Sequence, residues 1–115
     1  MDLRRGEVYW VDFEPAIGGE IKKVRPAVVV SNDIANAKLN RVLVVPLTSQ
    51  TQRLYPGETL IRLRGQSSKA MADQLTTTSK LRFKAFIGQI TDADLQLIER
   101  AILLQLGISL RGFRP

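Results

Sequence analysis

The sequence predicts a small, mainly β domain in which a strongly bent antiparallel sheet, or partial barrel, is followed by a C-terminal helix. From Glu7 to Ile90, apolar residues alternate with polar ones or form short β-branched runs, and Gly, Pro and Asn separate these segments. After Thr91 the apolar residues recur with the helical period. The length of 115 residues fits a single domain spanning residues 1–115.

The first half of the chain predicts three strands and one short helix. Glu7–Asp12 alternates polar and apolar residues as a half-buried strand does. Pro26–Val30 is a continuous apolar run that its proline can only open, because proline cannot donate to the strand ladder. An Asn-Asp pair before Ile34–Leu39 can cap a short helix, and Arg41–Thr48 is the third strand.

The second half of the chain predicts further short strands and then the helix. Thr59–Leu63 and Lys84–Ile90 each form one strand, and Lys69–Thr78 forms one or two. Thr91 can cap the helix and Gly107 can end it. The wide apolar face of this helix predicts core packing and leaves room for a subunit contact. The face comprises Leu95, Ile98, Ile102 and Leu106, widened by Leu97, Ala101 and Leu104.

Two connections are rich in polar and turn residues. Phe13–Val24 has about a dozen residues, which is the upper end of ordinary connections, and we therefore expect it to be functional. Its Gly18-Gly19 pair is not followed by the lysine of a phosphate-binding loop, so we interpret it as flexibility beside a binding groove. The second connection, Gln50–Gly57, is a polar loop.

The net charge of +6 is concentrated in the middle of the chain. Residues 34–90 carry nine basic side chains against Glu58 and Asp73, whereas the segments on either side are nearly balanced. This distribution indicates an electropositive face that can bind a polyanion such as a nucleic acid. A solvated basic surface would show the same distribution, so charge alone leaves both interpretations open.

The absence of histidine and cysteine excludes several kinds of chemistry. No imidazole is present for acid–base catalysis or metal binding, and no thiolate or disulfide can form. A zinc site would need four carboxylates. No apolar run approaches the length of a membrane span, and the first residues lack the apolar stretch of a signal peptide. We expect a cytoplasmic protein with no cofactor, no metal site and no membrane partner.

Three short motifs, in a fixed order, resemble those of one toxin family. Arg25-Pro26 opens the apolar strand, Pro46-Leu47-Thr48-Ser49 ends the next strand, and Asp73-Gln74 follows. Each motif is weak alone, but their order and spacing in one short chain are specific. With the N-terminal segment Arg5–Pro15, they make residues 4–106 resemble the MazF/PemK (Kid) toxins of type II toxin–antitoxin systems.

The resemblance implies an SH3-like, partly open barrel of the CcdB/PemK type, with short helices and a C-terminal helix, that forms a homodimer. It implies a metal-independent mRNA interferase that cleaves single-stranded RNA at a short sequence. Attack by the ribose 2′-OH would leave 2′,3′-cyclic phosphate and 5′-OH ends. A MazE-like cognate antitoxin would inhibit the toxin through an acidic, flexible tail, and operator DNA would be contacted only through that antitoxin.

Three residues match the family's catalytic positions. The guanidinium of Arg25 can hold a phosphate with two hydrogen bonds and stabilise the charge of the transition state, and it can also protonate the leaving oxygen. The hydroxyl of Thr48 can bond a phosphate oxygen or orient the 2′-OH. Glu20 can act as the general base or position Arg25. The adjacent lysine charges lower the pKa of Glu20, which favours its ionised form but weakens it as a base.

Eight further residues are expected to contact RNA. Gln74 can bond a base edge, whereas a structural ion pair with an arginine is the alternative for Asp73. Tyr55 is the best candidate for stacking on an unpaired base, ahead of Phe13, and Trp10 is expected in the core. The eight are Lys22, Lys23, Ser49, Gln50, Arg53, Tyr55, Asp73 and Gln74.

Two other functions remain open on the sequence. A gyrase poison of the CcdB type shares the barrel but binds a protein, and it acts through a tryptophan near its C-terminus. Here the single tryptophan is Trp10. A non-catalytic SH3-like module that binds nucleic acid fits the charge but leaves the pairing of Arg25 with Thr48 unexplained. Retained RNA binding without cleavage in Arg25→Ala would separate an enzyme from such a module.

Overall fold

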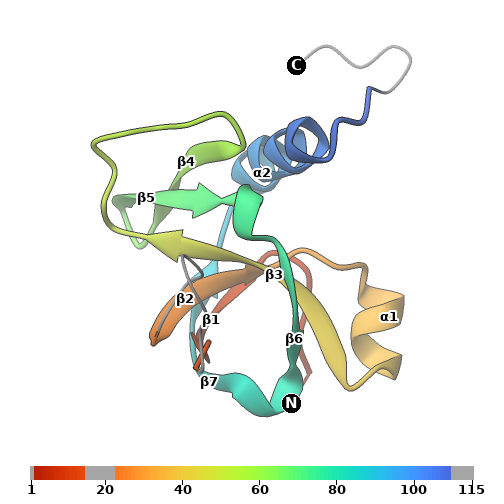
Figure 1. Ribbon diagram of the computed structural model, residues 1–115. Coiled ribbons are helices and arrows are strands. Elements are labelled where there is room, and N and C mark those ends of the chain that lie inside the picture. Colours follow the sequence, from red (N-terminus) through yellow and green to blue (C-terminus); the bar gives the residue numbers. More distant parts are fainter. Residues whose placement is uncertain (1, 15–22, 110–115) are drawn as a thin grey trace.

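The computed structural model describes residues 2–14 and 23–109 of the chain (Figure 1). These residues form a curled antiparallel sheet with two α-helices, which confirms the predicted mainly β fold. The strands are β1 (Glu7–Asp12), β2 (Val24–Val29), β3 (Arg41–Thr48), β4 (Glu58–Leu63), β5 (Gln66–Met71), β6 (Thr76–Ser79) and β7 (Phe83–Gln89). The helices are α1 (Asp33–Lys38) and α2 (Asp92–Leu106), with short 3₁₀ turns η1 (Ala72–Gln74) and η2 (Lys80–Arg82).

Strand β3 organises the sheet because it pairs with three different neighbours. The strand order is β4-β5-β3-β2-β1-β7, and β6 also pairs with β3. The first half of β3 pairs with β6, its middle with β2, and Leu47 and Thr48 pair with β5. Because its partners diverge, the sheet curls around β3, as Figure 1 shows.

The central strands bury side chains on both of their faces. Adjacent residues such as Val28 and Val29 are both fully buried, which explains why β2 has a continuous apolar run rather than an alternating one. One face packs under α2 and the β4–β5 hairpin, through Val8, Val28, Val45, Leu47, Ile61, Ala70, Ile87, Ile90 and Ile98. The opposite face packs through Leu3, Tyr9, Val11, Ala27, Val29, Val42, Val44 and Phe83.

The capping predictions for both helices are confirmed. Asn32 begins α1 by accepting a hydrogen bond from the Ala35 amide at 2.8 Å. Thr91 begins α2 by accepting one from the Asp94 amide at 3.1 Å, and Gly107, at φ +69°, ends it.

The apolar face of α2 is narrower than the sequence predicts. Ile98 and Ala101 are buried, and Leu95 and Ile102 pack against the core. The remaining large apolar residues of the predicted face are exposed: Leu97, Leu104 and Leu106.

Candidate functional site

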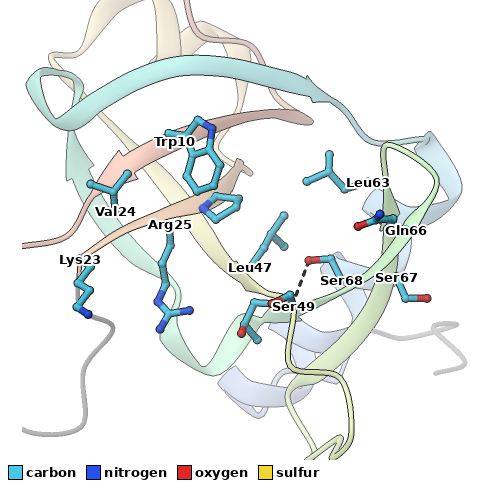
Figure 2. Close-up of a pocket in the computed structure, with 12 residues that line it drawn as sticks. Trp10, Lys23, Val24, Arg25, Leu47, Ser49, Leu63, Gln66, Ser67 and Ser68 are labelled. Carbon is cyan, nitrogen blue, oxygen red and sulfur yellow. Dashed lines mark hydrogen bonds between the residues drawn. The ribbon is translucent and has the colours of Figure 1, made fainter.

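A groove of about 370 Å³ opens between the β1–β2 ribbon and the β4–β5 hairpin (Figure 2). The groove lies on the same strand faces that, further along the strands, form the core under α2. On β2, Val28 is buried in that core, and Pro26 and Val24, on the same face, line the groove. On β5, Ala70 is buried in the same core, and Ser68, two residues earlier on the same face, lines the groove. The groove therefore begins where α2 and the core side chains no longer cover the strands.

Arg25 and Thr48 meet at one end of this groove. The β2–β3 ladder pairs Val28 with Val45 and Ala27 with Pro46. Beyond the Ala27–Pro46 pair, β2 leads back to Arg25 and β3 leads on to Thr48, so each residue lies two positions past a paired residue of the two adjacent strands. Both residues are partly buried and both line the groove. The structure thus brings together the two residues that the family motifs single out.

Thr48 lies where β3 leaves β2 and pairs with β5. Its cross-strand partner on β5 is Lys69, and its carbonyl oxygen accepts a hydrogen bond from Ser68 Oγ at 3.2 Å (Figure 2). The Thr48 hydroxyl oxygen accepts a bond from the Gln50 amide at 3.3 Å. Because its backbone is held on β5, the hydroxyl of Thr48 is presented at a defined place in the groove.

Lys23 stands at the edge of the groove in a strained backbone conformation. Its φ of +67° is unusual for a residue with a side chain. Its amide donates to Glu14 Oε1 at 2.8 Å, and its carbonyl accepts from the Phe13 amide at 3.1 Å. Arg82 donates to the carbonyls of Asp12 and Glu14. These contacts join the two ends of the predicted functional loop next to Arg25, while Glu20 and Lys22 lie outside the described residues.

The other predicted RNA-binding residues divide between the groove and the loop beside it. Ser49 lines the groove with Lys23 and Arg25, and Figure 2 shows these three side chains at the same end. Gln50, Arg53 and Tyr55 lie in the connection from β3 to β4 and do not line the groove. Arg53 Nη1 donates to Tyr55 Oη at 3.1 Å, and the Tyr55 side chain is exposed.

Asp73 and Gln74 lie in η1, next to α2 and away from the groove lining. The Asp73 amide donates to the Gly57 carbonyl at 3.2 Å, which fixes the end of the β3–β4 connection. In the described part of the chain Asp73 forms no ion pair, so the arginine pairing considered from the sequence is not observed there.

The prediction that Trp10 lies in the core is wrong. Trp10 is 41% exposed and lines the groove as the cross-strand partner of Pro26. Its strand face is buried only at Val8, two residues earlier, where the core side chains cover the sheet. Sequence reasoning also missed the hydroxyl and amide groups of the opposite wall, Ser67, Ser68 and Gln66. Their only signal was the alternation that leads from Gln66 through Ser68 to the buried Ala70.

The charge of the groove lining suits an anionic ligand. Lys23 and Arg25 line it, and none of the described lining residues is acidic. Among the described residues, no three Asp or Glu side chains gather where they could hold a metal ion. Neither helix of the described chain has the length and apolar character needed to cross a membrane.

Two known proteins are similar to this chain along most of its length. Endoribonuclease MazF9 of Mycobacterium tuberculosis is 37% identical over 115 aligned positions, which cover 92% of this chain and 98% of that protein. The endoribonuclease toxin MazF of Escherichia coli K12 is 35% identical over 103 positions, covering 89% and 92%.

Solved structures show the same fold. MazF from Deinococcus radiodurans superposes with a TM-score of 0.83 over 94% of this chain and 99% of that one, at 24% identity. A mycobacterial endoribonuclease in complex with its cognate antitoxin superposes with a TM-score of 0.79, over 94% and 98%, at 26% identity. The model of the PemK-like, MazF-like toxins of type II toxin–antitoxin systems matches residues 4–106. The chain belongs to this toxin family.

Proposed function

We propose that the chain is an endoribonuclease toxin that cleaves single-stranded RNA at a short base sequence. The observation that carries this proposal is that Arg25 and Thr48 line the same open groove, together with the cationic side chain of Lys23. Both curated relatives are named endoribonucleases, which supports the same activity here.

The proposed reaction needs only side chains and the RNA itself. The ribose 2′ oxygen attacks the adjacent phosphorus, and the bond from phosphorus to the 5′ oxygen of the next nucleotide breaks. The guanidinium of Arg25 bonds the non-bridging oxygens and stabilises the negative charge that builds up in the transition state. The Thr48 hydroxyl bonds a phosphate oxygen or orients the 2′-OH. The products are a 2′,3′-cyclic phosphate and a 5′-OH end.

Two proton transfers complete the reaction. The 2′-OH must lose its proton, and Glu20 is our candidate for the base. The departing 5′ oxygen must gain a proton, which Arg25 or a water molecule can supply. The Arg25 guanidinium supplies a positive charge at the phosphate, and we propose that no metal ion is required.

RNA binding is proposed to extend from this end along the groove and over the neighbouring loop. Lys23 and Ser49 contact phosphates, and Trp10 stacks on an unpaired base. The remaining predicted contacts are Lys22, Gln50, Arg53, Tyr55, Asp73 and Gln74. We propose a homodimer, as the family resemblance implies.

The cognate antitoxin is the proposed inhibitor. Related toxins have been solved in complex with antitoxins, including the mycobacterial pair and the MazE–MazF complex from Deinococcus radiodurans. An acidic tail lying over Lys23 and Arg25 would exclude RNA by charge and by occupancy. Contact with operator DNA is proposed only through the antitoxin.

The test is incubation of the purified protein with long single-stranded RNA in excess chelator, followed by mapping of the fragment ends. We expect discrete cuts with 2′,3′-cyclic phosphate and 5′-OH ends. Arg25→Ala should lower kcat by roughly 10²–10³-fold, the usual cost of removing one transition-state donor. It should retain RNA binding and its melting temperature, because the side chain is only partly buried. Intact RNA from a folded wild-type protein would refute the proposal.

A further inference from the structure

Lys69 is a buried cation that the proposed mechanism does not use. It is 9% exposed and lies on β5 as the cross-strand partner of Thr48. Its Nζ forms an ion pair with Glu58 Oε1 at 3.3 Å and donates to the Arg53 carbonyl at 3.1 Å. Both side chains of the pair are about nine-tenths buried. Such pairs contribute little net stability because desolvation opposes their attraction, so stability alone does not account for the pair.

The contacts of Lys69 converge on the loop between β3 and β4. Glu58 Oε1 also accepts a hydrogen bond from the Tyr55 amide at 2.8 Å, and the Glu58 amide donates to the Tyr55 carbonyl at 3.0 Å. Lys69 therefore holds Arg53 directly through its carbonyl and Tyr55 indirectly through Glu58. The Arg53 and Tyr55 side chains, which bond one another, are the exposed ends of this arrangement.

The same lysine thereby connects the loop to the catalytic strand. Its backbone is paired with Thr48, and its side chain spans the distance from there to Arg53. The loop is thus held about the length of one lysine side chain away from Thr48, where the phosphate is proposed to bind. A guanidinium beside an aromatic ring at that distance can stack on and bond a base next to the scissile phosphate.

We propose that Lys69 is a positioning residue that holds the Arg53–Tyr55 segment against the catalytic end of the groove and so sets which RNA bases are accepted there. The inference rests on the proposed ribonuclease function. Lys69 itself does not touch RNA, because its ammonium group is enclosed between Glu58 and the Arg53 carbonyl.

The test compares two variants, Glu58→Gln and Lys69→Met/Glu58→Gln, that differ only in the side chain at position 69. Lys69→Met alone would leave Glu58 buried without a partner, which is strongly destabilising. Glu58→Gln keeps an oxygen for the Tyr55 amide and leaves Lys69 bonded to the Arg53 carbonyl, but it removes the counterion of Lys69 and is therefore expected to be less stable than the wild type. It serves as the control for the loss of the carboxylate. The double variant Lys69→Met/Glu58→Gln removes the Arg53 contact without burying an unpaired charge. Lys69→Arg, which can still donate to the Arg53 carbonyl, is the conservative rescue.

Each variant is checked for folding by thermal unfolding, and its cut sites are then mapped on a long RNA, with kcat and KM measured at the best site. Relative to Glu58→Gln, the double variant should cut a broader set of sequences and show a KM about tenfold higher, equivalent to about 1.4 kcal/mol, with little change in kcat. Lys69→Arg should restore the wild-type pattern.

Two results would overturn the inference. One is an unchanged cut-site pattern and KM in a folded double variant, and the other is a loss confined to kcat, which would place Lys69 in the chemistry. If the wild-type protein itself leaves RNA intact, the proposed function fails instead. The wild-type control therefore distinguishes failure of the inference from failure of the proposed function.

Discussion

Trp10 presents an aromatic ring at the groove because the core side chains on its strand face end at Val8. Stacking of one base on an aromatic side chain contributes roughly 1–3 kcal/mol. We therefore expect Trp10→Leu to raise the KM for RNA by roughly tenfold with little effect on kcat. The melting temperature should change little, because the ring is half-exposed.

Trp10 also provides a direct signal, since it is the only tryptophan. Titration with an RNA whose scissile 2′-OH is replaced by hydrogen should quench its fluorescence in step with binding. Phe86→Leu, which changes an exposed aromatic residue outside the groove lining, should leave KM unaltered. An unchanged KM in Trp10→Leu would remove the ring from the RNA-binding surface.

Tyr9 couples stability to alkaline pH. Burial, and then the Glu7 carboxylate, which accepts a hydrogen bond from the Tyr9 hydroxyl at 3.2 Å, raise the pKa of Tyr9 from 10.0 to about 12. Because the folded pKa lies above the unfolded one, the stabilisation is fully present below pH 10 and is lost as the pH rises from 10 through 12. Tyr9→Phe should flatten this loss in denaturant unfolding measured across that range. If both proteins lose stability equally with rising pH, other groups cause the loss at alkaline pH.

Arg25 and Thr48 could be singled out from the sequence because short motifs mark them, and in the structure both line the same groove. Their catalytic roles remain predictions. Trp10 and Ser68 could not be found in the same way. Strand alternation states which residues share a face, but the point where that face passes from core to groove depends on distant elements, here α2 and the β4–β5 hairpin.

Helix α2 covers one side of the core, so its N-cap is expected to affect stability without touching the groove. The Thr91 hydroxyl oxygen accepts from the Asp94 amide. Thr91→Ala should therefore lower the free energy of unfolding by about 1 kcal/mol. Denaturant unfolding measures this change, and Thr91→Ser, which keeps the hydroxyl, should recover most of it. A Thr91→Ala protein that lost cleavage while retaining its stability would contradict this separation of helix and site.

Most elements could be predicted because their local patterns are consistent with the fold. The strands at Glu7–Asp12 and Arg41–Thr48 have the predicted limits, and both helix caps lie where hydroxyl or amide side chains indicated. The width of the buried face of α2 was overestimated. Leu104 and Leu106 have the helical spacing of core residues, but both are exposed in the last turns of α2.

At the scale of the whole molecule, the arrangement of the sheet depends on pairings between distant segments. Residue patterns show that Arg41–Thr48 is a strand, but they do not show that it pairs with β6, β2 and β5 in succession. That succession produces the curl, and the curl produces the groove. A partial barrel could therefore be predicted as a class, whereas the residues that line its opening could not.

The net charge of +6 predicts RNA binding that weakens as salt concentration rises, and the groove identifies one of the charges responsible. Lys23 lies at the cationic end, whereas Lys38 lies in the last turn of α1, outside the groove lining. Each lysine-to-glutamine change removes one positive charge from the molecule. Only Lys23→Gln should reduce the slope of log KM against log salt concentration, by about 0.7 for one lost contact to a single-stranded phosphate.

The comparison distinguishes a local contact from a general field. If Lys23 and Lys38 alter the slope equally, RNA responds to the overall charge of the protein, and the groove does not hold a defined phosphate at Lys23. If only Lys23 alters it, the backbone of the RNA passes that residue on its way to Arg25. Because Lys23 has a φ of +67°, Lys23→Gly should reduce the slope to the same extent while relieving backbone strain. Equal slopes with different stabilities would show that the lysine is needed there for its charge and not for its backbone.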